Sequence, residues 1–239
     1  MSSLPHTSLK GVYLMSARIA IVVGAGSGLG RATTLTLHRA GLTVVAVDRS
    51  EDGSKHLPDE IHREVADATD PAVAGPLVNR IAAEVGPPDI LVNTIGAFEL
   101  GEALSVTAQS LTQLMEVNVG AALWLTQAVA PHMQEAGSGA IVHIAARPGV
   151  EPTAGYAAYG VSKAALIHLV RTLDVELRPL GIRVNVVVPQ IIATERNKEL
   201  FPAEMLTGAV EPNAIADVIA FLVSDAASPV SGAVVPTYG

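Results

Sequence analysis

Tyr159 and Lys163 are the residues of this sequence whose types and spacing point most directly to chemistry. They lie four residues apart in YGVSK, within the first turns of a predicted helix, so both side chains share one helical face. A free phenol has a pKa of about 10, and a neighbouring cation lowers that pKa. The pair therefore predicts a site in which Tyr159 gives or accepts a proton near neutral pH.

A glycine-rich stretch, GAGSGLG at residues 24–30, predicts a turn that binds phosphate. It follows an apolar run at 18–23, typical of a buried strand, and precedes a predicted helix. A second strand at 42–47 completes a β-α-β unit of about 30 residues. The glycines permit a tight turn and leave backbone N–H groups free for a pyrophosphate at the helix N-terminus. They are Gly24, Gly28 and Gly30.

Asp48 ends the second predicted strand, about 20 residues after the glycine turn. A carboxylate at this position accepts hydrogen bonds from the adenosine ribose hydroxyls and repels a 2′-phosphate. The sequence therefore favours NAD over NADP, and the neighbouring Arg49 weakens that preference without reversing it. The alternative is a tight turn that ends in a capping aspartate.

Helices and strands alternate through the rest of the predicted chain. Residues 51–60 are polar and predict a connection, and a short strand then leads to Asp67. Further helices are predicted at 71–85, 107–136 and 156–177, and further strands at 89–93, 139–146 and 182–189. This order predicts an α/β fold with a Rossmann-like, doubly wound parallel β-sheet flanked by helices. We expect one domain over residues 17–239 and a flexible N-terminal arm over 1–16.

Composition and charge argue against several classes of function. Apolar residues make up 49% of the chain but aromatic residues only 3%, as suits a buried parallel sheet covered by helices. The net charge of -8 argues against nucleic acid or an anionic membrane as a partner. Because there is no cysteine and the histidines are scattered, no metal site is expected. No apolar run has the length of a membrane span, so a cytoplasmic protein is expected.

Several further polar residues stand at predicted strand ends or inside apolar segments. Asn93 and Gly96 follow a strand, where ligands bind in doubly wound folds, although Asn93 equally suits a turn-stabilising role. Asn118 lies among apolar helix residues and needs hydrogen-bond partners, either in a structural bridge or in a proton path. His143 is predicted to be a hydrogen-bonded structural residue of a strand rather than a catalytic one.

Beyond its N-terminal arm, the chain resembles the short-chain dehydrogenase/reductase family over nearly its whole length. Seven motifs occur in the family's order. They are VGAGSGLG for the glycine turn, DAT at 67–69, NTIG at 93–96 for N-N-A-G, VNV around Asn118, YGVSK at 159–163, PQIIAT at 189–194 for P-G-x-I-x-T, and SDAASPVSG near the C-terminus.

The resemblance implies an oxidoreductase that transfers a hydride between NAD and a small-molecule carbonyl or alcohol. Tyr159 would exchange a proton with the substrate oxygen, Lys163 would hold the nicotinamide ribose, and Asn118 would anchor a water that relays the proton. The implied cofactor-binding residues are Gly24, Ser27, Gly28, Leu29, Gly30, Asp48, Arg49, Asp67, Ala68, Asn93, Gly96, Tyr159, Lys163, Ile192 and Thr194.

The sequence departs from the family pattern at the catalytic serine, which falls 13 residues before the tyrosine and is Ala146 here. Losing one such hydrogen-bond donor costs about 100- to 1,000-fold in rate. Three interpretations remain open: an enzyme that works with Tyr159 and Lys163 alone, an enzyme in which Arg147 or Gln190 compensates, or a non-catalytic dinucleotide-binding protein. Other departures are Thr94 and Ile95 in N-N-A-G, Gln190 after Pro189, and a short predicted substrate lid.

Two predicted helical segments, 119–131 and 156–170, are apolar on more than one face. The sheet covers one face, and a second copy of the chain would cover another. A homo-oligomer, a tetramer or a dimer, is therefore expected, and the resembled family commonly forms tetramers through these helices.

Overall fold

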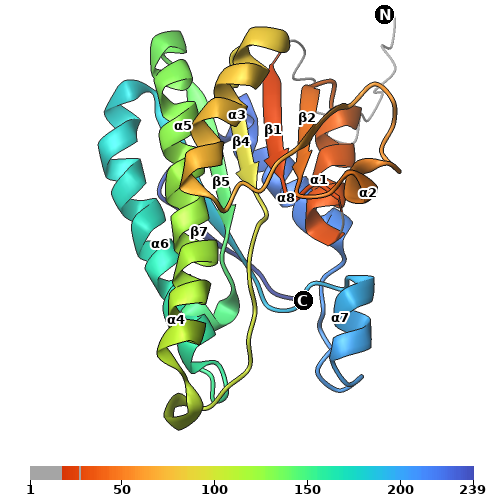
Figure 1. The fold of residues 1–239 in the computed structure, drawn as a ribbon, viewed down its shortest axis with the longest axis vertical. Coiled ribbons are helices and arrows are strands. Elements are labelled where there is room, and N and C mark those ends of the chain that lie inside the picture. Colours follow the sequence, from red (N-terminus) through yellow and green to blue (C-terminus); the bar gives the residue numbers. More distant parts are fainter. Residues whose placement is uncertain (1–17, 27) are drawn as a thin grey trace, which may run out of the picture.

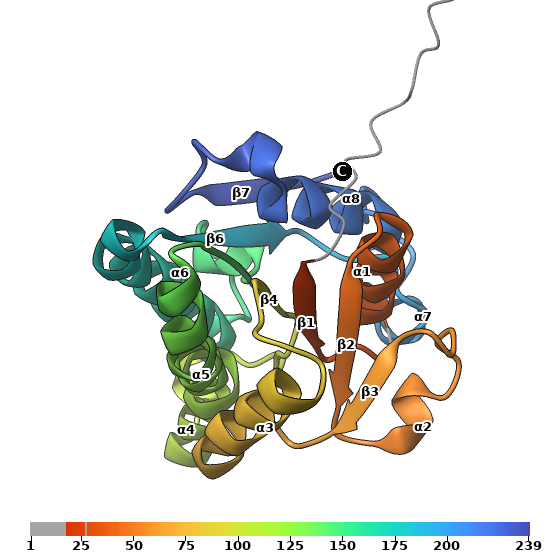
Figure 2. The same cartoon turned by 90° about the horizontal axis from the view of Figure 1, so that it is seen from above.

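The protein contains one sheet of seven parallel strands in the order β3-β2-β1-β4-β5-β6-β7 (Figures 1 and 2). The computed structural model describes residues 18–26 and 28–239. The predicted arm over 1–16 and the predicted site residue Ser27 lie outside the described residues. The strands are β1 Ile19–Val23, β2 Thr43–Asp48, β3 His62–Val65, β4 Ile90–Asn93, β5 Gly139–Ile144, β6 Ile182–Pro189 and β7 Val234–Thr237.

Helices cover both faces of the sheet, as Figure 2 shows from above. The buried side chains of α3, α5 and α6 pack on one face, and those of α1 and α8 pack on the other. The helices are α1 Gly28–Arg39, α2 Glu51–Ser54, α3 Pro71–Glu84, α4 Ala108–Met115, α5 Ala121–Ala136, α6 Ala157–Leu177, α7 Glu195–Leu200 and α8 Pro212–Val223, with short 3-10 turns at Ala103–Ser105, Arg147–Gly149, Arg178–Leu180 and Asp225–Ala227.

The strands are buried on both sides because their side chains alternate between the two layers. In β1, Ile21 and Val23 join the core beneath α3, α5 and α6. Ala20 and Val22 join the core beneath α1 and α8. Continuous apolar runs such as IAIVV are what a two-sided parallel sheet requires. The predicted fold class is confirmed.

The strand order reverses between β1 and β4, where the chain leaves the sheet in opposite directions on the two sides. Val23, the last residue of β1, is level with Val47 of β2 and with Asn93 of β4. Ligands of doubly wound sheets bind at this crevice beyond the carboxyl ends of the strands. The topology therefore brings the ends of β1, β2 and β4 to one place.

Three elements differ from the sequence prediction. The polar stretch at 51–60 contains a short helix, α2, which begins after Ser50, whose side chain accepts a hydrogen bond from the Gly53 N–H. The predicted helix at 107–136 is divided by a π-helical turn, η2 Glu116–Gly120. The seventh strand, β7, was not predicted, because four residues near a chain end carry little periodic signal.

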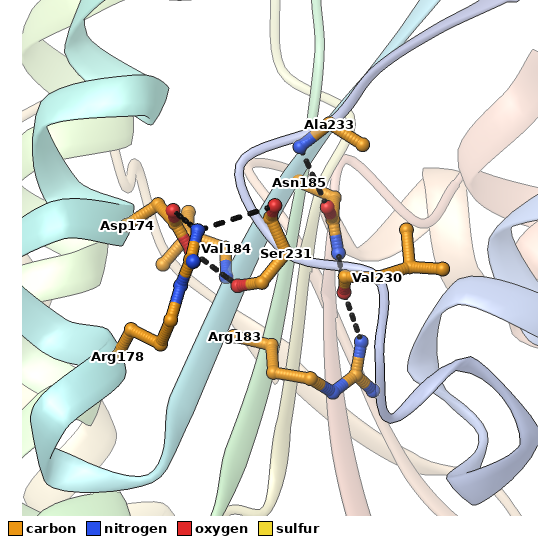
Figure 3. Close-up of polar contacts among 8 residues, drawn as sticks. All are labelled: Asp174, Arg178, Arg183, Val184, Asn185, Val230, Ser231 and Ala233. Carbon is orange, nitrogen blue, oxygen red and sulfur yellow. Dashed lines mark hydrogen bonds and ion pairs between the residues drawn. The ribbon is translucent and has the colours of Figure 1, made fainter.

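The C-terminal segment is attached to the sheet by side-chain hydrogen bonds (Figure 3). Asn185 of β6 accepts from the Ala233 N–H at 3.0 Å and donates to the Val230 carbonyl at 3.1 Å. Buried Asp174 of α6 contacts both Arg178 and Ser231. These contacts align β7 beside β6 and direct the last residues of the chain toward the carboxyl edge of the sheet.

Candidate active and cofactor site

A cavity of about 1750 Å³ lies at the carboxyl edge of the sheet and extends from Asp48 to Tyr159. A single small substrate fills far less space, so the volume suits a dinucleotide together with a substrate. Most of the predicted site residues line this cavity: Gly24, Gly28, Leu29, Gly30, Asp48, Arg49, Asp67, Ala68, Gly96, Tyr159, Ile192 and Thr194. Asn93, Asn118 and Lys163 are buried behind its wall.

The glycine turn is too closely packed to admit side chains. A Cβ on Gly30 would lie 1.8 Å from the carbonyl oxygen of Gly24. Gly24 itself has a φ of 80°, in the left-handed region that favours glycine. Gly28 stands against the methyl group of Thr194, which a Cβ on Gly28 would meet at 3.0 Å. The turn at the start of α1 therefore touches the loop after β6, where the resemblance placed the cofactor-binding residue Thr194.

Thr94 holds the glycine turn against the end of β4. Its hydroxyl donates to the carbonyl oxygen of Val23 at 2.7 Å, with a longer contact of 3.3 Å to the carbonyl of Gly24. Its backbone N–H also donates to the Val23 carbonyl. The departure from N-N-A-G at this position thus links β1 and β4 just below the cavity, which the sequence alone did not indicate.

Asp48 lies between two glycines at the other end of the cavity. Its Oδ2 accepts a hydrogen bond from the Gly26 N–H at 2.9 Å. A Cβ on Gly53 of α2 would lie 2.9 Å from Asp48 Oδ1, and one on Gly26 would lie 2.7 Å from Oδ2. The carboxylate is therefore held in place by backbone packing on both sides, beside the exposed Arg49.

Asp67 and Ala68 form the wall of the cavity next to β3. Asp67 Oδ1 accepts hydrogen bonds from the Thr69 hydroxyl at 2.6 Å and from the Thr69 N–H at 3.0 Å. These hydrogen bonds hold the pKa of the Asp67 carboxyl below its usual range. Ala68 is buried and packs against the core. This part of the wall therefore carries the Asp67 carboxylate beside the buried Ala68.

Tyr159 is surrounded by aromatic rings. The chain has three phenylalanines and four tyrosines, and Phe98, Tyr156, Tyr159 and Phe201 lie together. The ring of Phe98 stands edge-on to Tyr159 with centroids 4.9 Å apart, and Phe201 is 5.6 Å from Phe98. Burial, with a smaller contribution from Tyr156, raises the pKa of Tyr159.

The raised pKa corrects the sequence-based expectation that Lys163 lowers the pKa of the Tyr159 phenol. The Lys163 Nζ lies 5.9 Å from the centre of the Tyr159 ring and donates to the Ile144 carbonyl at 3.0 Å. Burial lowers the pKa of Lys163 itself to about 8, which weakens its effect as a cation. Desolvation of the phenol therefore outweighs the attraction of the ammonium in this state.

Asn118, Lys163 and Gly96 meet behind the cavity. A Cβ on Gly96 would lie 3.2 Å from Lys163 Nζ and 3.3 Å from Asn118 Oδ1. Asn118 accepts from the Ala97 N–H at 2.9 Å and donates to the Ala97 carbonyl at 3.0 Å. It also donates to the Ser162 hydroxyl at 2.9 Å. These bonds join η2 to the loop after β4 and to α6.

His143 joins two polar side chains beneath the site. It is fully buried, with Nδ1 3.4 Å from Asn93 Nδ2 and Nε2 3.1 Å from the Thr126 hydroxyl. Burial lowers the pKa of His143 to about 3, so the imidazole is neutral at pH 7. The predicted structural role of His143 agrees with this geometry. Asn93 Oδ1 accepts from the Ile95 N–H, which makes Asn93 turn-stabilising as well.

The serine position of the resembled family is an apolar wall here. Ala146 is buried, follows β5 and lines the cavity with Tyr159. The two compensating donors considered from the sequence contact each other, since Arg147 Nη1 donates to Gln190 Oε1 at 2.8 Å. Arg147 also pairs with Glu151 and lies over the ring of Tyr238, a contact that the sequence gave no means of finding.

Two other kinds of feature are absent from the described residues. Within residues 18–26 and 28–239, no three histidine, aspartate or glutamate side chains are placed to hold a metal ion. None of the helices in the described part of the chain combines the length and hydropathy that crossing a bilayer needs.

Comparison with known proteins identifies the family. Residues 18–205 match the family described as short chain dehydrogenase. The 3-oxoacyl-[acyl-carrier-protein] reductase of Salmonella typhimurium is 34% identical, with 90% of this chain and 93% of the relative covered. A solved 7α-hydroxysteroid dehydrogenase complexed with NADH is 31% identical, with 95% of each chain covered and a TM-score of 0.90.

A gluconate 5-dehydrogenase structure from Beutenbergia cavernae, described as putative and NAD(P)-dependent and containing NADP, is 33% identical. Its TM-score is 0.86, with 95% of this chain and 97% of that chain covered. The chain belongs to the short-chain dehydrogenase family.

Proposed function

We propose that the protein is an NAD(H)-dependent oxidoreductase that interconverts a carbonyl and an alcohol. One observation carries the proposal: Tyr159 lines the same cavity as the closely packed glycine turn, and Lys163 and Asn118 lie directly behind it at Gly96. A phenol that opens onto a dinucleotide-sized cavity is arranged for proton exchange with a bound substrate. Family membership supports the reaction class.

The residues present fit a nicotinamide dinucleotide. Gly24, Gly28 and Gly30 leave the start of α1 bare for a pyrophosphate, and Asp48 stands where the adenosine ribose would be held. Ala68 would provide an apolar contact for the adenine, and Ile192 and Thr194, which line the same cavity, would contact the nicotinamide half. When bound, the nicotinamide supplies or accepts the hydride.

Tyr159 would give its proton to the substrate oxygen during reduction and take it back during oxidation. Its raised pKa keeps the phenol protonated at pH 7, which suits reduction. Lys163 would hold the nicotinamide ribose from its buried position, and Asn118 would order the polar groups behind it. The rings of Phe98 and Phe201 would contact the substrate, which favours a ketone with an apolar ring.

Turnover and binding must be measured separately to test the proposal. NADH oxidation is expected with at least one ketone from a panel of cyclic and linear ketones, quinones and pterins. The competing hypothesis is a dinucleotide-binding protein without catalysis, which the alanine at 146 favours. It predicts NADH binding by calorimetry with no turnover of any panel member. Turnover at rates ordinary for dehydrogenases would exclude that alternative.

The cofactor preference tests the role proposed for Asp48. We expect NADH to bind at least about 10-fold more tightly than NADPH, since a 2′-phosphate would stand beside the Asp48 carboxylate. Asp48→Ser removes the charge and is expected to abolish most of this difference. Titrations of both cofactors by fluorescence measure it, with Asp52→Ser on the exposed face of α2 as a control. Equal affinities in the unchanged protein would contradict the proposal.

A homo-oligomer is also proposed. Val161 and Val175 of α6 are 58% and 72% exposed, which leaves apolar surface for a second copy of the chain. Leu111 of α4 lies 38% exposed in the same helical layer. Light scattering at micromolar concentration is expected to give at least the mass of a dimer. A monomeric mass would overturn this part of the proposal.

A further inference from the structure

The ends of β5 and β6 are joined by one side-chain hydrogen bond, beside the alanine that replaces serine. Ile144 is level with Val187 in the parallel register, and the Ala145 N–H donates to the Val187 carbonyl. Beyond this register, Arg147 begins the turn after β5 and Gln190 follows the end of β6, and their side chains are hydrogen-bonded at 2.8 Å. Neighbouring strands are about 4.8 Å apart. The Gln190 side chain therefore lies within reach of the wall at Ala146.

This hydrogen bond determines the orientation of the Gln190 amide. Arginine has only N–H donors, so the amide atom that faces Arg147 must be the oxygen. The Nε2 group, with two N–H donors, consequently points away from Arg147. Within the described part of the chain, Gln190 Nε2 has no hydrogen-bond partner. Gln190 lines the same cavity as Ala146 and Tyr159.

In Arg147, by contrast, each of the three guanidinium nitrogens has a polar partner. Its Nε and Nη2 both contact Glu151 Oε2, at 2.9 and 2.8 Å. Its guanidinium lies 4.9 Å from the centre of the Tyr238 ring, a cation–π distance. Tyr238 directly follows β7, which the Asn185 contacts hold beside β6. Arg147 is thus fixed on several sides, whereas the Gln190 Nε2 group has no partner among the described residues.

We propose that Gln190 Nε2 donates a hydrogen bond to the substrate oxygen and so replaces the hydroxyl that Ala146 lacks. Arg147 is a positioning residue, because it orients the Gln190 amide. This inference rests on the proposed function. During reduction, negative charge grows on the substrate oxygen until the Tyr159 proton reaches it. An oriented amide N–H stabilises such charge, as side-chain amides do in oxyanion sites.

Gln190→Met tests the proposal because it keeps the length of the side chain and removes the donor. We expect kcat to fall about 100- to 1,000-fold, with the NADH Kd changed less than about threefold. The matched control is Gln134→Met, an exposed glutamine of α5 that does not line the cavity. Arg147→Met is expected to lower kcat less than Gln190→Met does, because the Gln190 amide is still present but is no longer oriented. Adding Arg147→Met to Gln190→Met is expected to lower kcat little further.

Introducing the missing hydroxyl makes the test decisive. In the otherwise unchanged protein, Ala146→Ser is expected to change kcat little. In the Gln190→Met background it is expected to raise kcat at least about 10-fold, because the new hydroxyl takes the place of the lost amide donor. If Tyr159→Phe lowers kcat but Gln190→Met does not, the inference about Gln190 is overturned, whereas the proposed function is still supported. A loss of NADH affinity without a change in kcat also overturns the inference, since the amide then contacts the cofactor.

The remaining outcomes are distinguished by whether the unchanged protein turns over a ketone. If only Ala146→Ser turns over a panel ketone, Gln190 does not supply the donor and the inference fails, although the site is a dehydrogenase site. If neither protein turns over any panel member while NADH still binds, the proposed function fails, and the inference fails with it.

Discussion

Tyr159→Phe is expected to lower kcat by about 10²- to 10⁴-fold, the contribution of a positioned general acid. The phenylalanine ring keeps the contacts with Phe98 and Tyr156, so only the hydroxyl is lost. NADH affinity and the midpoint of urea unfolding are therefore expected to stay nearly unchanged. Stopped-flow measurement of NADH oxidation with the best panel ketone gives the rate.

Tyr156→Phe is the matched control for this experiment. Tyr156 belongs to the same ring cluster, with its centroid 6.2 Å from that of Tyr159, and its hydroxyl has no assigned part in proton transfer. We expect its kcat to change by less than about threefold. If Tyr159→Phe retains a rate within that range, another group transfers the proton and the proposed mechanism is wrong.

Gly30→Ala is expected to abolish cofactor binding and to destabilise the fold. The added Cβ would lie 1.8 Å from the Gly24 carbonyl oxygen and 2.8 Å from Thr94 Oγ1, so the turn must open. Opening it separates the N–H groups that are arranged for a pyrophosphate, and the NADH Kd is expected to rise at least about 100-fold. Overpacking of this kind costs about 3 kcal/mol of unfolding free energy.

Gly101→Ala provides the comparison for the glycine turn. A Cβ on Gly101 would meet its nearest neighbour, the Ser105 hydroxyl, at 3.7 Å, which is an ordinary contact. Its stability and NADH affinity are expected to match those of the unchanged protein in urea unfolding and calorimetry. An NADH affinity for Gly30→Ala equal to that of the control would show that the cofactor does not bind at this turn.

The order of elements was readable from the sequence because it depends on local patterns. Uninterrupted apolar runs predicted buried strands, and β6 occupies the predicted residues 182–189. Capping residues and prolines predicted helix ends, so α3 begins at Pro71 as expected. The glycine turn and the Tyr159–Lys163 pair are likewise encoded within a few residues. From these, the family and the fold class followed.

The elements that were mispredicted depend on contacts between distant segments. The π-helical turn at Glu116–Gly120 presents Asn118 to Ala97 and Ser162, and no local pattern indicates such a turn. The short helix α2 packs Gly53 against Asp48 and Gly26. In each case, the conformation is stabilised by partners that only the folded chain supplies.

By itself the sequence determined that this chain forms a doubly wound sheet with a glycine turn at one strand end and a helix carrying Tyr159 and Lys163. Only the tertiary structure decided the direction of the Tyr159 pKa shift. Burial next to Phe98 raises the pKa of Tyr159, whereas the sequence predicted a lower pKa. The tertiary structure also brought into contact the two donors that the sequence offered in place of the absent hydroxyl. Arg147 and Gln190 are far apart in sequence, and only the parallel pairing of β5 with β6 brings the segments that follow these strands together, next to Ala146.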